Sequence, residues 1–485
     1  MYFGRLMPKL LVANRGEIAI RIFKTARKKG WICVAIYSEA DAQSMHLQYA
    51  DEAYCIGPAP SNQSYLHIDA IIALAIKVKA DFIHPGYGFL SENAEFAQAV
   101  RNAGIRFVGP DAEAMQHLGN KISAKITAHS LGIPLVPGNH TSISNSEEAF
   151  KIAESIGFPV IIKAAAGGGG KGMRIIHLPE QLKEGIVLAR SEALASFGND
   201  DIFIERFIQS PRHIEIQVVG DMHGTVLFLP PRECSLQRRH QKIMEESPAN
   251  EVSTELIGKM SEDAVRLAKS CDYYSTGTVE FIVEGDHYYF LEMNTRLQVE
   301  HTVTEMITGL DLVDMQLEVA NGRPFALSQK DIISNGHAIQ WRINAEDPFN
   351  NFAPSSGNIQ NFRPPAMDHL RLDSGYTSGK EISVYYDSLI AKLIAWAPDR
   401  LQCISALRSA LNAFIIEGVI TTIPFGIQVL DQPAIKAGHY SVDFLDKNLP
   451  HILDNSTNTL HSKAAAILAL HLYNKSTPRV IIPKT

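Results

Sequence analysis

Short apolar runs alternate with amphipathic helical patterns between residues 9 and 108. The runs KLLVA, ICVAIY, DFIHP and IRFVG have the length and composition of buried strands, whereas Ile18, Ile22 and Ala26 recur at helical spacing. Turn residues separate the two kinds of segment. Strands that alternate with helices predict a parallel sheet covered by helices. We therefore predict one open α/β domain over residues 1–120.

A second pattern begins after the polar stretch GNHTSISNSEEA. An apolar run, four glycines and another apolar run follow one another in FPVIIKAAAGGGGKGMRIIH, which predicts a β-hairpin with a mobile tip. A helical pattern over residues 179–195 and the run IFIERFI complete a small inserted α+β unit over residues 135–205. Residues 206–449 combine strands such as HIEIQVVG and TGTVEFIVEG with helices, and predict the largest domain.

The composition excludes several classes of protein. The 485 residues include 45 Lys and Arg against 52 Asp and Glu, a net charge of −7 without a basic block, so we expect no nucleic-acid partner. No apolar run reaches the roughly 18 residues of a membrane helix, so we expect no membrane association. The five cysteines contain no CxxC pair for a zinc site or a disulfide framework. We therefore expect a reducing compartment, the cytosol or an organelle matrix, and of these we predict the cytoplasm.

The glycine-rich segment is the first candidate for chemistry. Glycines let backbone amides approach anionic oxygens, and Lys163, at the end of the preceding strand, can reach a phosphate as a point charge. The alternative is a flexible linker, but linkers lie between polar tracts and this segment lies between strands of buried type. It does not match GxxxxGK[ST], and the turn ANRGEIA lacks the GxGxxG spacing, so we predict neither a P-loop nor a dinucleotide site.

Paired carboxylates in TVEFIVEGDHYYFLEMNTR form the second candidate. If the two strands pair around the turn EGDH, Glu280 lies roughly opposite Glu292, and Asn294 shares their face by the period of two. Facing carboxylates repel unless a cation lies between them, and a hard divalent ion such as Mg²⁺ prefers oxygen ligands. The alternative is that one glutamate faces solvent, because a slip of one residue would separate the pair.

Two charged runs, ECSLQRRHQK and MNTRLQVEH, are the third candidate. A single run of this kind is usually a solvated face, but two beside a candidate metal hairpin favour an anionic substrate. Glu300 is a candidate general base among these cations. His213 and His240 are either nucleotide contacts or structural histidines.

At this point the sequence resembles the ATP-grasp enzymes, and specifically biotin carboxylase, from about residue 9 to residue 446. The stretches that carry the resemblance are LVANRGEIAIRI, DEAYCIGPAPS, IHPGYGFLSEN, IIKAAAGGGGKGMRII, PRHIEIQV, ECSLQRRHQKIMEE, EMNTRLQVEHTVTEMITGLDLV and RINAEDP. Within them, EMNTRLQVEH is close to diagnostic of the biotin-dependent branch.

The resemblance implies a fold in the α/β and α+β classes. It implies an N-terminal, Rossmann-like biotin carboxylase domain over residues 1–120 and an ATP-grasp domain over 121–320. The lid of the latter would cover residues 135–205 and close over ATP. A C-terminal α+β domain would follow over 335–447, and then a tail over 450–485 in which we find no chemistry.

The resemblance also implies the roles of individual residues. The residues implied to contact ATP are Lys121, Lys163, Gly169, Gly170, Glu205, Arg206, Phe207, Ile208, His213 and His240. Glu280, Glu292 and Asn294 would hold Mg²⁺ or Mn²⁺. Lys242, Arg296, Val299 and Glu300 would surround bicarbonate, whereas Arg342 would face the ureido oxygen of biotin and Tyr87 would also line the site.

The implied reaction is the first half-reaction of a biotin-dependent carboxylase. Glu300 would take the proton of bicarbonate, which attacks the γ-phosphate of ATP to give carboxyphosphate and ADP. Carboxyphosphate releases carbon dioxide and phosphate in the closed site, phosphate deprotonates biotin, and Arg342 stabilises the developing negative oxygen. The products are carboxybiotin, ADP and phosphate.

The resemblance implies a biotinylated carrier protein, a carboxyltransferase subunit and a homodimeric state. No AMKM-like biotin-attachment motif is present, since the only Lys followed by Met is Lys259, so we expect a free-standing subunit. The segments RLDSGYTSGKEISVYYDSLIAKLIAWA and EGVITTIPF favour an acyl-CoA or pyruvate carboxylase over the acetyl-CoA enzyme. The final acceptor stays open, and fatty acid biosynthesis is among the pathways implied.

Two rival functions and three departures from the family pattern accompany this prediction. The rivals are another ATP-grasp ligase, of the carbamoyl-phosphate or amine-ligase type, and a nucleotide-binding regulatory protein without turnover. Ala166 interrupts the usual glycine run, Pro231 replaces a common acidic residue and Trp341 replaces a small one. These departures concern the lid and the shape of the biotin pocket.

Overall fold

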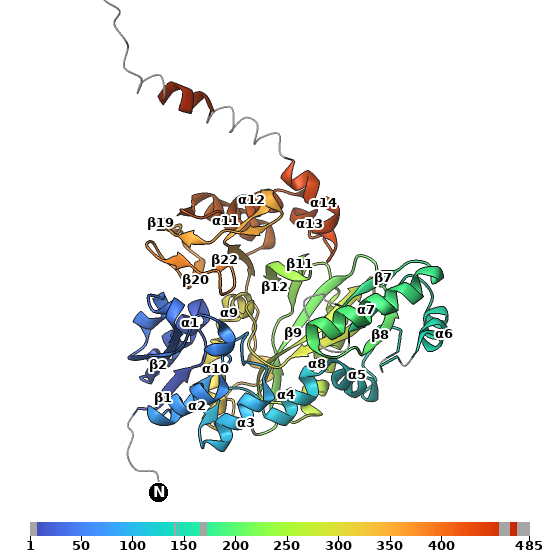
Figure 1. The fold of residues 1–485 in the computed structure, drawn as a ribbon, viewed down its shortest axis with the longest axis horizontal. Helices are drawn as coiled ribbons and strands as arrows, with labels where there is room; N and C mark the ends of the chain where they lie inside the picture. The colour runs from blue at the N-terminus through green and yellow to red at the C-terminus, as the bar shows by residue number, and fades with distance from the viewer. Residues whose placement is uncertain (1–6, 140–141, 144, 165–171, 455–465, 473–485) are drawn as a thin grey trace, which may run out of the picture.

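The structure is a computed structural model that describes residues 7–139, 142–143, 145–164, 172–454 and 466–472. It contains a five-stranded N-terminal sheet, a three-stranded lid and a nine-stranded central sheet that continues into the C-terminal region. Figure 1 shows the N-terminal elements in blue, the lid in green and the C-terminal elements in orange. Among the described helices, none combines the length and the apolar character that a bilayer crossing requires.

The N-terminal sheet is parallel, as predicted from the alternation of strands and helices. Its strand order is β3-β2-β1-β4-β5, with the helices between successive strands. The elements are β1 (Lys9–Val12), α1 (Gly16–Lys28), β2 (Ile32–Ser38), β3 (Glu52–Gly57), α2 (Ile68–Lys77), β4 (Phe82–His84), α3 (Ala94–Asn102), β5 (Arg106–Phe107) and α4 (Ala112–Gly119).

Helix α1 shows why this region folds as predicted. Ile18, Ile22 and Ala26 form its buried stripe against the sheet, while Arg27 and Lys28 lie in its last turn and favour the negative end of the helix dipole. Figure 1 shows α1 on the sheet beside the C-terminal elements. The loop before α1 therefore faces the C-terminal region.

The lid is an antiparallel sheet of order β7-β6-β8 packed against two helices. Its elements are α6 (Ser146–Ile156), β6 (Val160–Ala164), β7 (Arg174–Ile176), α7 (Leu182–Phe197) and β8 (Ile202–Arg206). The pairing of β6 with β7 confirms the predicted hairpin. Gly172 closes it with a φ of +69°, and a Cβ atom there would lie 2.8 Å from that of Ala164. The tip residues 165–171, which include Ala166, Gly169 and Gly170, lie outside the described residues.

The central sheet has the order β14-β13-β9-β11-β12-β15-β22-β20, and β10 pairs with β9. Its strands are β9 (Arg212–Gly220), β10 (Val226–Phe228), β11 (Arg232–Arg238), β12 (Gln241–Ser247), β13 (Ser275–Glu284), β14 (His287–Asn294), β15 (His337–Asn344), β20 (Leu370–Ser374) and β22 (Leu389–Ala397). Strand β12 pairs directly with β15, so one sheet joins the predicted ATP-binding and C-terminal regions.

Helices cover the central sheet and its C-terminal extension. They are α5 (Lys121–Ser130), α8 (Thr254–Lys269), α9 (His301–Thr308), α10 (Leu312–Ala320), α11 (Arg400–Ala413), α12 (Ile423–Leu430), α13 (Pro433–Ala437) and α14 (Phe444–Leu453). Short strand pairs connect the C-terminal loops: β16 (Glu346–Asp347) with β17 (Ala353–Pro354), β18 (Gly357–Asn358) with β21 (Glu381–Ile382), and β19 (Asn361–Arg363) with β23 (Ile415–Glu417).

Candidate active site

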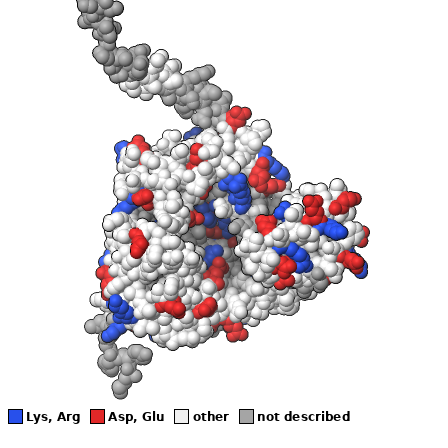
Figure 2. Space-filling view, in the orientation of Figure 1, with Lys and Arg blue, Asp and Glu red and all other residues white. Residues whose placement is uncertain are grey.

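A cavity of about 1120 Å³ lies where the N-terminal sheet, the lid, the central sheet and the C-terminal loops meet. Figure 2 shows it as a hollow in the molecular surface with charged side chains inside. Of the site residues predicted from the sequence and described by the structure, all except Glu205 line this cavity. The fold therefore brings together motifs that lie up to about 260 residues apart in the chain.

The hairpin of β13 and β14 has the register predicted from the alternation of residues. Glu280 is directly opposite Glu292, and Thr278 is opposite Asn294. The amide nitrogen of Asn294 donates to Oε1 of Glu280 over 3.1 Å. Nζ of Lys121 lies 3.1 Å from a carboxylate oxygen of Glu292. The alternative in which one glutamate turns to bulk solvent is wrong, because both side chains line the cavity.

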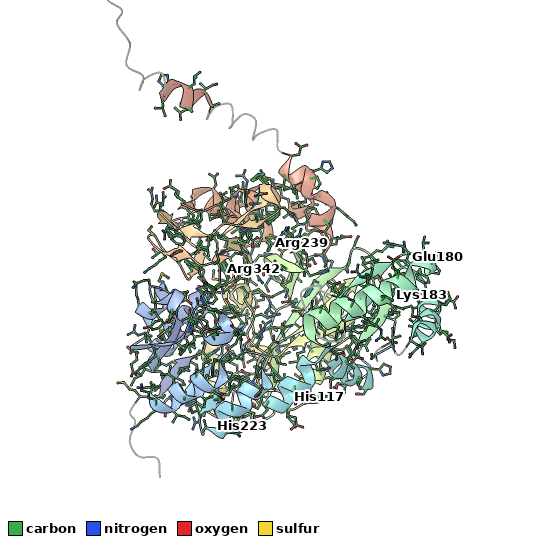
Figure 3. All side chains as sticks on the ribbon, in the orientation of Figure 1. His117, Glu180, Lys183, His223, Arg239 and Arg342 are labelled. Atoms are coloured by element: carbon green, nitrogen blue, oxygen red, sulfur yellow. The ribbon has the colours of Figure 1, made fainter. Side chains whose placement is uncertain are left out.

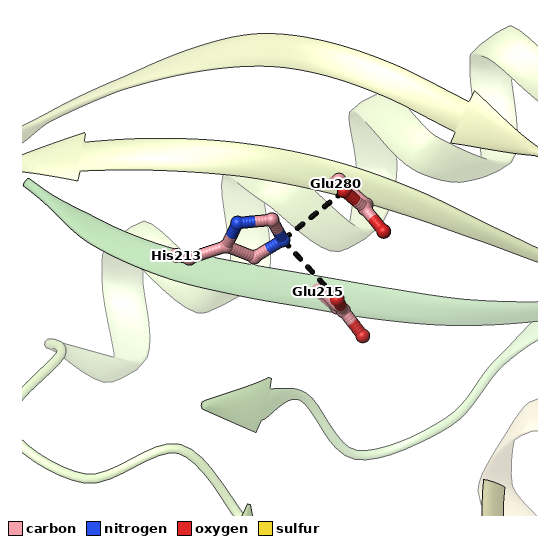
Figure 4. A group of neighbouring side chains, drawn as sticks. All are labelled: His213, Glu215 and Glu280. Atoms are coloured by element: carbon pink, nitrogen blue, oxygen red, sulfur yellow. Dashed lines mark ion pairs between the residues drawn. The ribbon is translucent and has the colours of Figure 1, made fainter. Parts of the chain in front are cut away.

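His213 contributes a cation beside Glu280. Its Nε2 atom lies 3.1 Å from Glu215 and 3.1 Å from Glu280, as Figure 4 shows. Burial lowers the pKa of His213, but the attraction of Glu280 and the hydrogen bonds of both carboxylates outweigh it and raise the pKa to about 9. An imidazolium therefore separates two buried carboxylates, Glu215 on β9 and Glu280 on β13.

The oxygen donors of Glu280, Glu292 and Asn294 fit a hard divalent cation. They come from neighbouring positions on adjacent strands and line the same cavity. Carboxylate and amide oxygens are the ligands that Mg²⁺ and Mn²⁺ prefer, and a site of this kind leaves coordination positions for phosphate oxygens. Nearby cations already balance the carboxylates, so the repulsion expected of an isolated pair is reduced by Lys121, Lys242 and His213.

Glu300 lies between two cations at the centre of the cavity. Its Oε1 atom is 2.7 Å from Nζ of Lys242, and its Oε2 atom is 3.0 Å from a guanidinium nitrogen of Arg342. Burial raises the pKa of Glu300, but the charges of Lys242 and Arg342 outweigh burial and hold the pKa below its ordinary value. Glu300 is therefore an ionised carboxylate, which is the form that accepts a proton.

The other predicted anion-binding residues surround this pair. Arg342, labelled in Figure 3, projects from β15 and donates from Nε to Glu245 over 2.6 Å. Arg296 contacts Glu92 over 2.9 Å and Asn294 over 2.8 Å, and it does not pair with Glu300 among the described contacts. The cations that pair with Glu300 are therefore Lys242 and Arg342.

A buried lysine supports the wall of the cavity next to Glu300. Nζ of Lys392 donates to the carbonyl oxygen of Val299 over 3.1 Å and lies 3.4 Å from the hydroxyl of Tyr87 and from Glu17. The lysine side chain is fully buried. It connects residues of the N-terminal, central and C-terminal regions, so it fixes the positions of two predicted site residues.

On the lid side, Lys163 is already paired with a carboxylate. Its Nζ atom lies 2.8 Å from Glu205, which is also bound by Lys125. Glu205 is fully buried and does not line the cavity, so its carboxylate holds the two lysines rather than a ligand. The neighbouring residues Arg206, Phe207 and Ile208 do line the cavity.

His240 lies at the tip of the β11–β12 hairpin with a φ of +63° and lines the cavity opposite the lid. Burial, with the nearby cations Lys163 and Lys121, lowers its pKa and favours the neutral ring. A neutral imidazole there can accept or donate a hydrogen bond to a nucleotide.

Sequence reasoning missed a buried polar layer beneath the site. Arg232 is fully buried and donates to Gln217 over 2.7 Å, to Gln298 and to Glu215, which in turn pairs with Lys242. A signal was present, because His213, Glu215 and Gln217 place polar residues at every second position of an otherwise apolar strand. That periodicity indicates a polar face turned toward the interior.

Three family models match successive parts of the chain. The biotin carboxylase N-terminal domain matches residues 6–115, the ATP-binding domain of the carbamoyl-phosphate synthase L chain matches 120–328, and the biotin carboxylase C-terminal domain matches 340–447. Biotin carboxylase 1 of Bacillus subtilis is 47% identical over 443 residues, which are 91% of this chain and 98% of that protein. The chain belongs to the biotin carboxylase family.

Longer carboxylase subunits are similar as well. The propionyl-CoA carboxylase alpha chain of Ruegeria pomeroyi is 47% identical over 96% of this chain and 72% of its own length. The mitochondrial methylcrotonoyl-CoA carboxylase subunit alpha of the mouse is 47% identical, and the match covers 97% of this chain but 66% of that protein. The chain thus spans nearly all of the Bacillus biotin carboxylase but about two thirds of these subunits.

Solved structures of the biotin carboxylase family share the fold. The biotin carboxylase domain dimer of Hydrogenobacter thermophilus 2-oxoglutarate carboxylase, in complex with MgADP, ADP and bicarbonate, has a TM-score of 0.89 at 43% identity and covers 93% of this chain and 100% of that one. Biotin carboxylase of Campylobacter jejuni also has a TM-score of 0.89 at 43% identity, and the match covers 91% of this chain and 99% of that one. The chain is therefore an ATP-dependent ligase of biotin carboxylation.

Two departures from the usual biotin carboxylase pattern leave the cavity unchanged. Trp341 is fully buried, packs 6.1 Å from the ring of Phe425 and does not line the cavity, since it alternates with Arg342 on β15. The carbonyl oxygen of Pro231 accepts hydrogen bonds from Ser247 and Ala249. Both residues are buried, and neither lines the cavity.

Proposed function

We propose that this chain carboxylates biotin held on a carrier protein, with bicarbonate and ATP, through the residues of this cavity. The observation that carries the assignment of roles is the position of Glu300, an ionised carboxylate between Lys242 and Arg342, in one cavity with the pair Glu280 and Glu292. A base, an anion site and a candidate metal site thus lie together.

The first step uses the anion site. Lys242 and Arg296 neutralise bicarbonate next to Val299, and Glu300 accepts its proton. The resulting dianion attacks the γ-phosphorus of ATP, the bond to the β,γ-bridging oxygen breaks, and carboxyphosphate and ADP form. Lys242 stays in contact with Glu300, so it can stabilise charge on both the base and the nucleophile.

Residues of the lid and of the central sheet bind ATP in this proposal. Lys121 and Lys163 contact phosphate oxygens, while Arg206, Phe207, Ile208, His213 and His240 surround the nucleotide, and Gly169 and Gly170 approach the phosphates. Glu280, Glu292 and Asn294 hold Mg²⁺ or Mn²⁺, which neutralises phosphate charge when it is bound. Lys163 must share its charge between Glu205 and the nucleotide.

The second step occurs at Arg342 and Tyr87. Carboxyphosphate breaks down to carbon dioxide and phosphate, and phosphate removes the proton from N1 of biotin. The ureido oxygen becomes negative and is stabilised by the guanidinium of Arg342, while N1 attacks carbon dioxide. A closed cavity protects carboxyphosphate from water, which gives the lid its function.

A single assay tests this function. Bicarbonate-dependent release of ADP is measured with and without free biotin, together with the formation of carboxybiotin. We expect biotin to stimulate ADP release and to be carboxylated. ADP release that ignores biotin would favour another ATP-grasp ligase, and ATP binding without turnover would favour a regulatory protein.

The biological setting is part of the same proposal. We infer three functional domains over residues 1–120, 121–320 and 335–447, a homodimer, a cytoplasmic location, and partnership with a biotinylated carrier and a carboxyltransferase. The relatives include acyl-CoA carboxylase subunits and pyruvate carboxylase, so the final acceptor stays open between an acyl-CoA and pyruvate. Co-purification of the chain with its carboxyltransferase, and an assay of that complex with several acyl-CoAs, tests this setting.

A further inference from the structure

Lys125 is a lysine of the cavity to which the proposed reaction assigns no role. It lines the cavity, yet its side chain is only 6% exposed, against 19% for Lys163. A charged ammonium group is rarely buried unless a specific partner compensates for the water that it loses. The contacts of Lys125 therefore indicate what this residue does.

Helix α5 carries Lys125 from the central sheet toward the lid. Lys125 lies one turn after Lys121, so both residues share a face of the helix, and both line the cavity. Lys121 lies 3.1 Å from Glu292 on β14. The neighbouring residues Ala124 and Ala128 pack into the hydrophobic core of the central sheet. A contact between Lys125 and the lid therefore joins two separately packed parts of the chain.

Lys125 meets the face of the lid sheet that is turned to the cavity. In the pairing of β6 with β8, Lys163 lies opposite Phe203, and both side chains line the cavity. Glu205 is two residues after Phe203 on β8, so it shares their face. Nζ of Lys125 lies 4.4 Å from the centre of the Phe203 ring, a cation–π contact, and it also reaches Glu205.

The carboxylate of Glu205 divides its two oxygen atoms between two lysines. Oε1 accepts a hydrogen bond from Nζ of Lys125, and Oε2 accepts one from Nζ of Lys163 over 2.8 Å. Within the described part of the chain, no other side chain donates to this carboxylate. Two ammonium groups thus share one negative charge. Each lysine weakens the attraction of the carboxylate for the other.

The charges of these three residues depend on one another. Burial raises the pKa of Glu205, but Lys163 and Lys125 outweigh it and lower the pKa to about 2. Burial lowers the pKa of Lys125, Glu205 opposes this, and the nearby charges of Lys163 and Lys121 lower the pKa further. Lys125 therefore depends on Glu205 to stay charged. Without that carboxylate, its neutral amine would be favoured.

We infer that Lys125 is a positioning residue for nucleotide binding, because it neutralises Glu205 and so frees the ammonium of Lys163 for phosphate. This inference rests on the proposed function, in which Lys163 contacts the phosphate groups of ATP. The oxygens of a nucleoside polyphosphate compete with Oε2 of Glu205 for Lys163, and Lys125 shifts this competition toward the nucleotide. Lys125 acts through Glu205 and does not itself bind phosphate.

A cycle of single and double variants of the full chain tests this role, with the Kd for MgATP measured by titration calorimetry. Lys125→Met keeps the length of the side chain but leaves both oxygens of Glu205 to Lys163, so we expect the Kd to rise about fivefold or more. Lys125→Gln, a second neutral variant, should act in the same way. Lys125→Arg keeps the charge and should resemble the unaltered chain.

The double variant distinguishes action through Glu205 from a direct effect. In Glu205→Gln the shared negative charge is absent, so adding Lys125→Met should change the Kd by less than about twofold. A rise of the same size with and without Glu205→Gln would mean that Lys125 binds the nucleotide directly or supports the fold, and would overturn the inference. An unchanged Kd in Lys125→Met and Lys125→Gln would overturn it as well.

Two further measurements separate this role from damage to α5 and from failure of the proposed function. Ile126→Gln alters the next position of the helix, which is 54% exposed and outside the cavity lining, and should leave the Kd unchanged. Biotin carboxylation by the unaltered chain is assayed on the same preparation. MgATP binding without carboxylation would overturn the proposed function, whereas the Kd values would still decide the role of Lys125. An unaltered chain that does not bind MgATP would overturn both.

Discussion

A carboxylate oxygen of Glu300 lies 3.0 Å from a guanidinium nitrogen of Arg342. The two residues are 42 positions apart: Glu300 lies in the turn before α9, and Arg342 lies on β15. The proposed base for bicarbonate therefore touches the proposed partner of biotin. The Glu300–Arg342 ion pair therefore links the activation of bicarbonate to the binding of biotin.

Glu300→Gln should separate binding from chemistry. The amide keeps the size of the side chain but cannot take a proton, and general-base catalysis contributes about 10²- to 10⁴-fold. We expect bicarbonate-dependent ATP cleavage to fall by a factor of about that range while ATP affinity stays within a fewfold. Turnover and ATP affinity are measured on one preparation, and near-normal turnover would exclude Glu300 as the base.

Arg342→Gln is the complementary variant, because it removes the same ion pair and leaves the base in place. We expect bicarbonate-dependent ATP cleavage without biotin to persist, since Lys242 still holds Glu300. Stimulation by biotin and the formation of carboxybiotin should fall about tenfold or more, as expected for loss of a charged hydrogen bond in the transition state. Equal losses of both activities would show that Arg342 acts on bicarbonate rather than on biotin.

The register of the acidic hairpin was predictable because it depends on local rules. A short turn between two alternating strands fixes which residues face each other, and Glu280 does lie opposite Glu292. The parallel sheet, the lid hairpin and the helix α1 were predictable for the same reason. Each depends on the spacing of apolar residues within about 20 positions.

The electrostatic environment was not predictable in the same way. Nothing in the neighbourhood of Lys163 in the sequence indicates that Glu205, 42 positions away, already binds it. The fully buried Arg232, and the contact of Lys392 with Val299, depend on how three regions of the chain pack together. Such contacts are long-range, and only a resemblance to a family or a structure supplies them.

Metal dependence tests the hairpin. Glu292→Gln removes the negative charge of a carboxylate that faces Lys121, so we expect the metal to bind more weakly. The Mg²⁺ concentration that gives half-maximal activity should rise about tenfold. Chelation of divalent ions should abolish turnover of the unaltered chain. Glu284→Gln, on the paired strand β13 but outside the cavity lining, is the control and should not change the Mg²⁺ requirement. An unchanged requirement in Glu292→Gln would exclude this residue as a ligand.

Lys163→Ala should weaken ATP binding, with a magnitude reduced by the partner of the lysine. A charged hydrogen bond contributes about 1.5–3 kcal/mol, but Lys163 divides its charge between Glu205 and the nucleotide. We expect the Kd for MgATP to rise about tenfold, measured by titration calorimetry. Lys151→Ala, an exposed lysine on the lid helix α6, is the control. Glu205→Gln removes the charged partner of Lys163 and frees its ammonium for the nucleotide, so this variant should lower the Kd for MgATP. The same Kd for both variants would contradict the assignment of Lys163 as a phosphate contact.

Acid stability should depend on Glu246, behind the site. Its carboxylate accepts from His337 over 2.6 Å and from Arg400 over 2.7 Å, and it is fully buried. Burial raises the pKa of Glu246, but the hydrogen bond from His337 and the charge of Arg400 outweigh it and lower the pKa to about 2. Because the pKa is lower in the folded state than the ordinary value of 4.5, the ionised group stabilises the fold above about pH 4.5. This stabilisation is lost as the pH falls from there toward 2.

Glu246→Gln measures this contribution directly. Breaking a buried ion pair costs about 3–5 kcal/mol, so we expect a loss of that order in the free energy of unfolding at pH 6. The difference between the unaltered chain and the variant should shrink steadily between pH 4.5 and pH 3, by about 1.4 kcal/mol per pH unit. Chemical denaturation at several pH values measures this difference in the free energy of unfolding. Glu255→Gln, on the exposed face of α8, is the control and should leave the stability unchanged. A difference that stays constant from pH 6 to pH 3 would mean that Glu246 contributes through its shape and packing and not through its charge.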